Sequence, residues 1–333
     1  MRAMRLLQQS AAEDLPLKLA DLPTPKPGPG QILVEVQVCG VCHTDLHAIE
    51  GDIHPPHLPL TIGHQVVGRV AGLGEGVTRF KPGQRVGIPW LYRACGICEF
   101  CQRGEENLCP YAKFTGFDVD GGYADFMLAE AKYTLPLPDE LTDDQAAPLL
   151  CAGIIGYRSL HKADLQRGER LGLVGFGASA HLAIQIANHW GCRTFVFTRA
   201  EEHRHHAREL GAVWAGSIDD DSPEPIDRAV LFAPVGKLVP LILKKLRPGG
   251  TLAINAIHLS PIPELDYELL YGERTLRSVA NATYQDGVEL LELAVKIPIR
   301  ATINPYPLLE ANQALLDLKH SRINGEAILK IKS

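Results

Sequence analysis

Hydrophobic and polar positions alternate in the first third of the chain. Apolar residues occupy every second position from Ile32 to Val38, with mostly polar residues between them. A period of two is that of a half-buried strand. Gly and Pro recur around this run, for example at Pro23 to Gly30 and at Pro82-Gly83, which indicates short strands joined by turns. The pattern predicts a β-rich first region.

The pattern changes after about Ala152, where strand-like runs alternate with helix-like stretches such as Ala178 to Trp190. Six strands with crossovers between them predict a doubly wound parallel sheet, and therefore an α/β fold for this part of the chain. The expected strands are Arg170–Gly175, Thr194–Thr198, Ala212–Ala215, Arg228–Phe232, Thr251–Ala256 and Thr275–Val279.

Two more helices follow, near Gly287 to Val295 and Leu308 to Leu318, and then a last strand, Ala327 to Ile331. That strand has no place in the six-strand set, so we expect it to return to the first region. A chain of 333 residues is long enough for two cores. The expected domains are residues 1–152 with 283–333, and residues 153–282.

Composition narrows the class of partner. The chain is 46% hydrophobic and 22% charged with a net charge of −6, which gives no general attraction to nucleic acid or to a membrane surface. No signal-peptide core or membrane-length apolar run is visible. Eight cysteines without an export signal indicate a reducing compartment. We therefore expect a cytoplasmic protein with a small-molecule partner.

Four of the cysteines lie close together, at spacings of three, three and eight. Four thiolates so spaced suit one tetrahedral zinc, and a closed set of four leaves no position for chemistry. Disulfides are disfavoured, because neighbours three apart on a tight loop pair poorly. The sequence therefore predicts a structural zinc in a lobe at about residues 90–112. Its ligands are Cys95, Cys98, Cys101 and Cys109.

Four motifs, in this order and over nearly the whole chain, resemble the zinc-containing medium-chain alcohol dehydrogenases. They are Cys39-Gly-Val-Cys-His-Thr-Asp-Leu-His47, the pair Gly63-His64, the four-cysteine lobe, and Leu150-Cys151-Ala-Gly153. The resemblance implies a GroES-like catalytic domain followed by a Rossmann domain. It also implies a catalytic zinc on Cys42, His64 and Cys151, whose spacing alone would never unite them.

The residue types fit that role. Two thiolates and a neutral imidazole balance the dication and leave a fourth position for water or a substrate oxygen. Metal-bound water has a pKa near 7, and an alcohol is expected to be acidified in the same way. By resemblance, Thr44 accepts the alcohol proton and His47 releases it to solvent, while Asp45 orients His64.

The turn Gly175-Phe-Gly177-Ala-Ser-Ala180 follows an apolar strand and opens a helix, which is the setting of a dinucleotide site. Thr198 and Arg199 stand at the end of the second strand, where enzymes that use NAD usually carry a carboxylate. A hydroxyl and a guanidinium there suit a 2′-phosphate, which favours NADP. NAD remains the alternative, with the arginine stacked on adenine.

Several positions are assigned only by comparison with the family. His43 resembles a residue that contacts the pyrophosphate, and Ile155 stands where a Thr commonly packs against the nicotinamide. Two positions depart from the family: Gln65 replaces the usual Glu after the zinc histidine, and Glu326 replaces an Arg that reaches the pyrophosphate. The amide of Gln65 keeps the shape of the family's Glu and loses its negative charge, and Glu326 removes the favourable positive charge of the Arg.

The resulting hypothesis is reversible hydride transfer between a primary or secondary alcohol, or its aldehyde, and NAD(P), with two zinc ions per chain. Trp90 and Ile53 are candidate pocket residues that suggest small aliphatic or benzylic substrates. Polyol and formaldehyde dehydrogenases of the same family are alternatives, and so is a non-catalytic zinc- or redox-responsive binding protein. Zinc-free reductases with this fold lack the three ligands. Relatives of this size imply a homo-oligomer, a dimer or tetramer.

Overall fold

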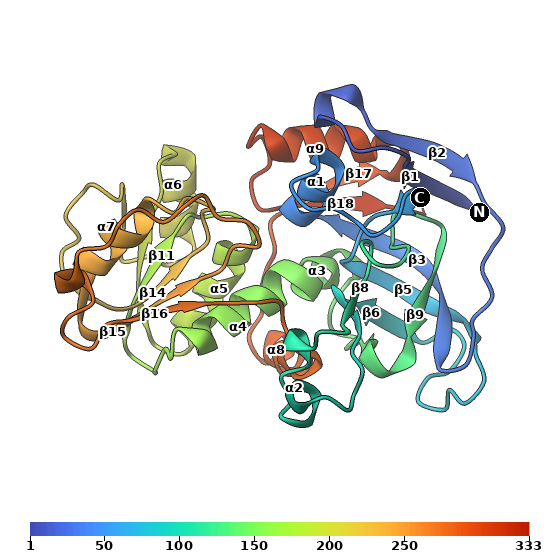
Figure 1. Cartoon of the computed structure of the whole chain (residues 1–333), viewed down its shortest axis with the longest axis horizontal. Helices are drawn as coiled ribbons and strands as arrows, with labels where there is room; N and C mark the ends of the chain where they lie inside the picture. Colours follow the sequence, from blue (N-terminus) through green and yellow to red (C-terminus); the bar gives the residue numbers. More distant parts are fainter. Residues whose placement is uncertain (333) are drawn as a thin grey trace. The chain divides into compact units, whose positions relative to one another are not determined.

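The structure is a computed structural model that describes residues 1–332 and divides into two compact units. The first unit combines Met1–Ala152, Asn281–Lys296 and Ala301–Ser333, and the second combines Gly153–Ala280 with Ile297–Arg300. In Figure 1 the first unit is blue, green and red, and the second is yellow-green to orange. The return of Ile297–Arg300 to the second unit is a detail that the hydrophobic pattern does not reveal.

The first unit is organised around the long strand β3 (Gln31–Val41), which has neighbours along both edges. One edge pairs with β5; the other pairs with β9 along its first half and with β18 near its end. The sheet order is β10-β6-β5-β3-β18-β17. The other strands of this sheet are β5 (Val66–Leu73), β6 (Arg85–Ile88), β9 (Phe126–Glu130), β10 (Leu135–Pro136), β17 (Ile303–Pro307) and β18 (Glu326–Lys330).

The period-two pattern on β3 is a burial pattern in the folded chain. Ile32, Val34 and Val36 are fully buried, whereas the residues between them are partly exposed. Their side chains pack in a core with residues of β1, β5 and helix α9. Burying one face of the strand in this way fixes its register, because a slip of one residue would turn the apolar side chains to solvent.

The last strand returns to the first unit, as the sequence predicts. β18 pairs antiparallel with β3, with Ala327 opposite Val41 and Lys330 opposite Val38. Two smaller sheets complete the β-structure: β1 (Arg2–Leu6) between β2 (Leu17–Asp21) and β4 (Leu60–Thr61), and the pair β7 (Leu91–Arg93) and β8 (Lys113–Phe114). Helices of this unit are α1 (His43–Glu50), α2 (Glu99–Gln102), α3 (Asp143–Pro148), α8 (Tyr284–Lys296) and α9 (Ala311–Lys319).

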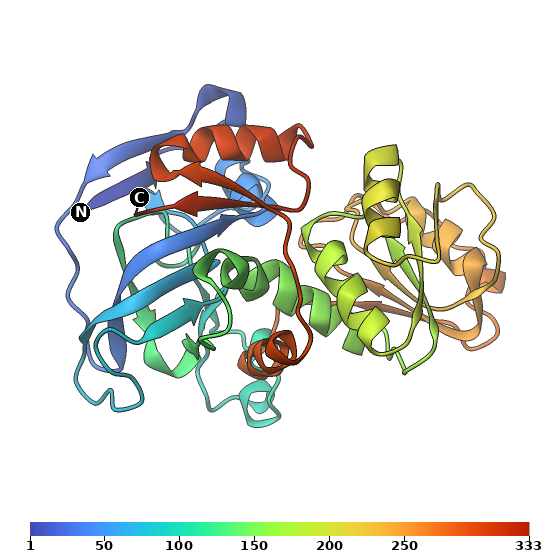
Figure 2. The same cartoon turned by 180° about the vertical axis from the view of Figure 1, so that it is seen from behind.

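The second unit holds a six-stranded parallel sheet in the order β13-β12-β11-β14-β15-β16. The order reverses beside β11, and helices cover both faces of the sheet (Figure 2). The strands are β11 (Arg170–Val174), β12 (Arg193–Phe197), β13 (Trp214–Gly216), β14 (Ile226–Leu231), β15 (Leu246–Ile254) and β16 (Thr275–Ser278).

Helices link these strands, and α5 (Ala178–His189) follows the glycine turn. α5 contacts β11 and β12, while α7 (Leu238–Lys245) packs on β14 and β15. The sequence pattern placed the next strand at Thr251, but β15 begins directly after α7, because Leu246 pairs with Ile226 before a bulge. The remaining helices are α4 (Ile154–Lys162) and α6 (Glu201–Glu209).

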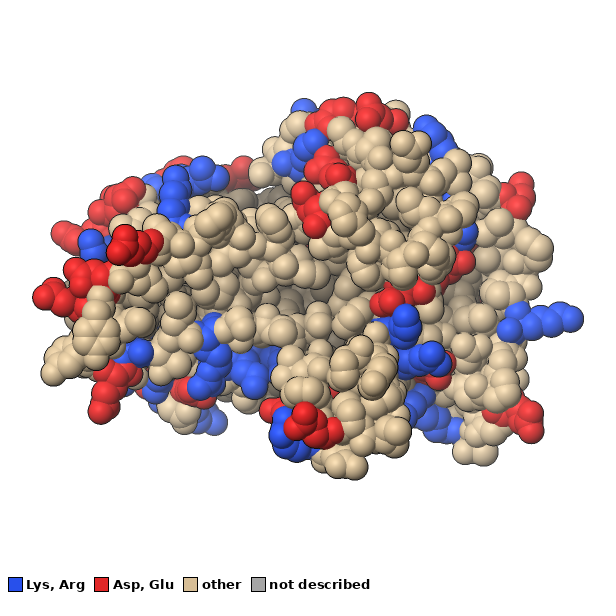
Figure 3. All heavy atoms as spheres, viewed as in Figure 1, with Lys and Arg blue, Asp and Glu red and all other residues tan. Residues whose placement is uncertain are grey.

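Two surface features complete the description. Among residues 1–332, no helix combines the length and apolar character needed to cross a membrane. On the face shown in Figure 3, basic and acidic side chains are scattered among one another.

Candidate metal centres and active site

The structure brings together three side chains that lie far apart in the sequence. Donor atoms of Cys42, His64 and Cys151 all fall within 4.8 Å of one another. Cys42 stands at the junction of β3 and α1, His64 precedes β5, and Cys151 lies in a π-helical turn, Leu149–Gly153, between α3 and α4. Such a turn widens the helix by one residue and occurs often at functional sites.

Local hydrogen bonds hold Cys42 at the start of α1. Its backbone N–H donates to Asp45 Oδ2 at 3.0 Å, and its sulfur accepts the backbone N–H of Thr44 at 3.3 Å. This is a capping box, in which the first residue and the fourth satisfy each other's groups. The helix start therefore fixes the sulfur position before any metal is considered.

Asp45 orients the imidazole of His64. Its Oδ1 atom lies 3.2 Å from His64 Nδ1 and also accepts the backbone N–H of Gly63, while Tyr123 donates its hydroxyl to Oδ2 at 3.4 Å. Asp45 and His64 are both buried. A carboxylate at Nδ1 leaves Nε2 free to act as a metal ligand, and Nε2 lies 3.1 Å from Cys42 Sγ.

The pKa values of the two thiols in this set are shifted in opposite directions. A hydrogen bond from Cys151 and the charge of His64 hold the pKa of Cys42 well below its usual range, against the opposing effect of burial. The same hydrogen bond, with burial, raises the pKa of Cys151 well above its usual value. The contacts of Cys42 thus favour its thiolate form, which is the form that binds metal.

The candidate relay residues lie on the first turns of α1. His43, exposed, begins the helix, and Thr44 follows it, half-buried. One turn later, His47 places Nδ1 2.7 Å from Oδ2 of Asp52, a carboxylate that is half exposed. His47 therefore lies next to a solvent-accessible proton acceptor.

An aromatic wall lies beside His64. The Trp90 ring is 4.8 Å from the His64 ring, edge to face, and stacks on Phe114 at 5.0 Å. Phe117 lies 5.8 Å from the same indole, and Asn281 accepts its N–H at 3.1 Å. Sequence reasoning proposed Trp90 but missed the other three, because nothing in their spacing marks them.

The other proposed pocket residue, Ile53, lies on the loop after α1. Its backbone N–H donates to the His47 carbonyl, and its own carbonyl accepts the side chain of Gln9. These bonds place its backbone next to His47, and its part in a pocket stays a prediction.

The two departures from the family meet in the structure. Gln65 donates its side-chain amide to Glu326 Oε1 at 3.0 Å, and both residues are buried. Burial raises the pKa of Glu326 well above its usual value, and the charge of Cys42 adds to the increase.

The four cysteines of the lobe also converge, with all four sulfurs within 4.8 Å of one another. Backbone N–H groups of Gly96, Cys98 and Tyr111 donate to these sulfurs at 3.3 to 3.4 Å. The N–H groups of Ile97 and Cys98 lower the pKa of Cys95 to about 6. Backbone donors on one short loop thus favour the thiolate form that a zinc ion requires.

The glycine turn of the second unit has the shape of a dinucleotide site. Gly175 has φ +88°, and a Cβ there would lie 2.9 Å from the backbone nitrogen of Ala233. Gly177 is the cap residue directly before α5, and a Cβ there would meet no other atom, so a phosphate can approach the backbone closely. Ala180 is fully buried at the third position of the motif.

The candidate cofactor-selecting residues lie at the end of β12. Thr198 donates its backbone N–H to Gly216, and its carbonyl accepts the side chain of Arg204. Arg199 is exposed and makes no hydrogen bond or ion pair with the described residues. Ile155 is half-buried on the first turn of α4.

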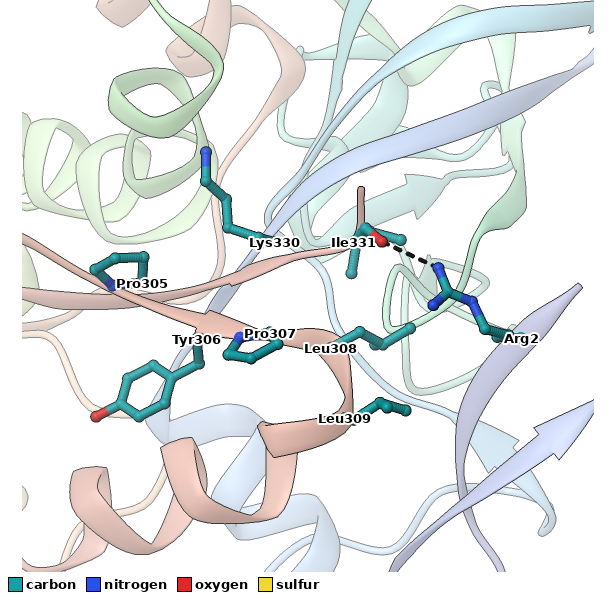
Figure 4. Close-up of a pocket in the computed structure, with 8 residues that line it drawn as sticks. All are labelled: Arg2, Pro305, Tyr306, Pro307, Leu308, Leu309, Lys330 and Ile331. Carbon is teal, nitrogen blue, oxygen red and sulfur yellow. Dashed lines mark hydrogen bonds between the residues drawn. The ribbon is translucent and has the colours of Figure 1, made fainter. Parts of the chain in front are cut away.

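A pocket elsewhere in the first unit contains none of the candidate site residues (Figure 4). Arg2 and Lys330 line it together with apolar side chains, and Arg2 donates to the Ile331 carbonyl at 3.2 Å. Both cations are neutralised, Arg2 by Asp125 and Lys330 by Asp144. The pocket therefore offers no unpaired charge to a ligand.

Comparison with known proteins places this geometry in a family. Residues 28–139 match the alcohol dehydrogenase GroES-like domain. A probable alcohol dehydrogenase, AdhA, from Mycobacterium tuberculosis is 46% identical over 99% of this chain and 97% of its own length. Among solved structures, a cinnamyl alcohol dehydrogenase from Sorghum bicolor has a TM-score of 0.91 and 26% identity, covering 99% of this chain and 97% of its own.

A cobalt- and zinc-bound thermostable alcohol dehydrogenase from Pyrobaculum aerophilum is also similar. It has a TM-score of 0.89 and 25% identity, and the match covers 99% of both chains. The names of these relatives agree on one activity, so the chain is an oxidoreductase of the alcohol dehydrogenase type. The sequence and the fold therefore identify it as a member of the zinc-containing medium-chain alcohol dehydrogenase family.

Proposed function

We propose that the chain catalyses reversible hydride transfer between a primary or secondary alcohol and a nicotinamide dinucleotide, assisted by a zinc ion held by Cys42, His64 and Cys151. The observation that carries the proposal is the convergence of these three donors within 4.8 Å. Two sulfurs and one nitrogen are the ligand types that zinc prefers, and three protein ligands leave one position open. A zinc ion held by these residues would act as a Lewis acid that lowers the pKa of a bound alcohol and makes it a better hydride donor.

The residues around the donors support the proposal through their own contacts. Asp45 holds the imidazole of His64 in the tautomer and orientation that a ligand needs. We infer that Thr44 receives the alcohol proton, because its backbone N–H donates to Cys42 Sγ at 3.3 Å, which places it beside the three donors. His47 then passes the proton toward Asp52 and solvent, because its Nδ1 lies 2.7 Å from the exposed carboxylate of Asp52.

The second unit supplies the dinucleotide site of the proposal. The backbone at Gly177 leaves room for a pyrophosphate, and the start of α5 offers it N–H groups. The exposed, unpaired guanidinium of Arg199 and the hydroxyl of Thr198 suit a 2′-phosphate, so we propose NADP as the preferred cofactor. His43 and Ile155 remain candidates for contacts to pyrophosphate and nicotinamide.

A second zinc ion, on the four-cysteine lobe, completes the proposal of two zinc ions per chain. Four thiolates close its coordination, so this ion stabilises the lobe and takes no part in hydride transfer. The aromatic wall of Trp90, Phe114 and Phe117 favours small aliphatic or benzylic alcohols as substrates.

The decisive experiment combines zinc content with initial rates. Ethanol, a longer alkanol and benzyl alcohol are each assayed with NAD and with NADP, following absorbance at 340 nm. We expect about two zinc ions per chain and alcohol-dependent reduction that is faster with NADP. Two zinc ions without turnover of any alcohol would instead support a binding protein. Turnover restricted to polyols or formaldehyde would identify the chain as a polyol or formaldehyde dehydrogenase.

The cofactor proposal has its own test in Arg199→Asp. A carboxylate there repels a 2′-phosphate and accepts ribose hydroxyls, so the ratio of kcat/KM for NADP to that for NAD should fall by about a hundredfold, which is about 2.7 kcal/mol of discrimination. Arg208→Asp, which alters an exposed arginine of α6, serves as a control for added negative charge. An unchanged ratio in Arg199→Asp would remove the argument for NADP.

A further inference from the structure

Gln65 and Glu326 form a buried polar pair that the proposed chemistry does not use. Their exposed fractions are 0% and 1%, and they share one hydrogen bond, from Gln65 Nε2 to Glu326 Oε1 at 3.0 Å. The two residues are 261 positions apart in the sequence. Only the pairing of β5 and β18 with opposite edges of β3 brings them together.

Strand register places this pair beside the metal-binding residues. Ala327 lies opposite Val41, so in an antiparallel pair Glu326 comes level with Cys42. On the other edge of β3, Gly40 donates its N–H to the carbonyl of Gln65 at 2.9 Å. A Cβ on Gly40 would lie 2.8 Å from the Gln65 carboxamide, so the missing side chain makes room for it.

The pair is incompletely satisfied. Gln65 Oε1 and Glu326 Oε2 are buried, and within residues 1–332 neither has a hydrogen-bond partner. A buried carboxylate oxygen without a partner is costly unless a positive charge compensates it. No Lys or Arg among the described residues forms an ion pair with Glu326.

The neighbouring charges are those of the metal-binding set. Cys42, His64 and Asp45 act electrostatically on Glu326, and Glu326 acts on Cys151. The thiolates and Asp45 repel a carboxylate, and the imidazole is neutral when it binds a metal. A divalent cation among the three donors is therefore the positive charge that would stabilise Glu326 in this position.

We propose that Glu326, positioned by Gln65, is the buried counter-charge of the metal ion held by Cys42, His64 and Cys151, and that it slows the loss of that ion. The inference rests on the proposed function, because it requires a metal at those donors. By resemblance, the family carries Glu at the position of Gln65 and Arg at that of Glu326. This chain thus carries a carboxylate at position 326 and an amide at position 65, and the two side chains are in contact.

The test is the rate at which zinc passes from the purified enzyme to a chromogenic chelator. Glu326→Gln keeps the shape and removes the charge, and we expect release from the three-donor site to accelerate about tenfold, within the range known for groups that support metal ligands. Release from the lobe is the internal control and should not change. Zinc release from wild type is expected in two kinetic phases, one for each site. Cys42→Ala lacks the zinc of the three-donor site, so the phase that is missing in this variant belongs to that site.

Two further variants separate charge from structure. Glu326→Asp keeps the carboxylate, and Gln65→Glu with Glu326→Gln relocates it to position 65; both should release zinc within threefold of the wild-type rate. Glu310→Gln, on an exposed carboxylate of the same unit, should match wild type. With Co²⁺ in place of zinc, Glu326→Gln should shift the thiolate-to-cobalt absorption band, which a purely structural role would not do.

Each outcome decides between charge and structure. Zinc release from Glu326→Gln at the wild-type rate, or faster release that the relocated carboxylate fails to reverse, would overturn the proposal. Equal acceleration of both phases would overturn it as well, since it would reveal general loosening of the fold. If Glu326→Gln does not fold, the double variant alone decides: slow release supports the proposal, and fast release contradicts it. A wild-type chain that binds only the lobe zinc would instead defeat the proposed function.

Discussion

The two cysteine sets of the first unit are built in opposite ways. The lobe draws its four cysteines from residues 95–109, a single short segment whose sulfurs accept backbone N–H groups of the same loop. The other set draws Cys42, His64 and Cys151 from three separate elements, and its supporting contacts come from side chains such as Asp45. One set is made by local chain geometry, and the other exists only in the completed fold.

This difference matches the chemistry proposed for each set. Four thiolates on a loop close the coordination of a zinc ion, whereas three donors fixed by a folded core can keep a fourth position open. Such a position has to be held against collapse by packing and by outer hydrogen bonds, which the strands and α1 provide. We therefore predict that substitutions in the set of Cys42, His64 and Cys151 lower turnover, whereas substitutions in the lobe lower the free energy of unfolding.

The largest effect is expected for Cys42→Ala. Loss of one of three donors should abolish metal binding at this set and lower turnover by about a thousandfold or more, because a metal Lewis acid contributes several kcal/mol to the barrier. Turnover per folded chain is the measurement, with circular dichroism to show that the fold persists. Activity within tenfold of wild type would contradict the assignment.

Cys98→Ala should have the opposite profile. Without its closed coordination the lobe loses its zinc, and the free energy of unfolding of the first unit should fall by about 3 kcal/mol. That corresponds to a thermal midpoint lower by about 6–12 °C. Turnover per folded chain at low temperature should stay within threefold of wild type. A fall in turnover as large as that of Cys42→Ala would remove the distinction between the two sets.

Asp45→Asn should weaken metal binding at the three-donor set by about ten- to hundredfold, as for other carboxylates that orient a histidine ligand. The lobe zinc should be retained. Competition with a chelator of known affinity measures the change, and Asp21→Asn, the same chemical change on exposed strand β2, is the matched control. Unchanged affinity would show that His64 does not depend on Asp45.

A last effect concerns acid, which releases zinc from both sets, so acid-induced unfolding has to be measured separately from loss of metal. Burial lowers the pKa of His181 to about 4 from its ordinary 6.5. Between pH 4 and pH 6.5 the unfolded chain therefore binds more protons than the folded chain. The free energy of unfolding is therefore at its full value above about pH 6.5, and it decreases by up to about 3 kcal/mol as the pH falls toward 4.

His181→Leu should remove this dependence, because both ring nitrogens lack partners in the described part of the chain and no hydrogen bond is lost. Urea denaturation of the second unit between pH 4 and 8 measures the effect. His189→Leu, an exposed position on the same helix, should keep the wild-type pH profile. An equally steep loss of stability in His181→Leu would show that another group controls it.

Much of the fold could be predicted from the sequence because its signals are local. The alternation on β3, the six strands of the second unit and the glycine turn before α5 are all visible within a few residues. The observed strand bounds differ from the predicted ones where strand pairing determines them. For example, β15 begins at Leu246 because that residue pairs with Ile226. The assignment of Ile297–Arg300 to the second unit likewise depends on tertiary contacts.

The candidate site likewise has parts that local sequence spacing predicts and parts that only the folded chain brings together. The spacing of the lobe cysteines predicts a zinc site unaided, whereas Cys42, His64 and Cys151 could be joined only through the family resemblance. Phe114 and Phe117 reach Trp90 through folding of the lobe region, which no periodicity encodes. Contact between Gln65 and Glu326 depends on the register of β18 against β3, so the sequence showed two departures without showing that they meet.

The account is tested most directly by counting zinc and turnover together in wild type, Cys42→Ala and Cys98→Ala. Native mass spectrometry of each protein, with rates measured on the same samples, should give two, one and one zinc ions per chain. Alcohol oxidation should persist in wild type and Cys98→Ala and be lost in Cys42→Ala. Turnover in Cys42→Ala, or two zinc ions still bound to it, would contradict the central claim that a zinc ion on Cys42, His64 and Cys151 carries the chemistry.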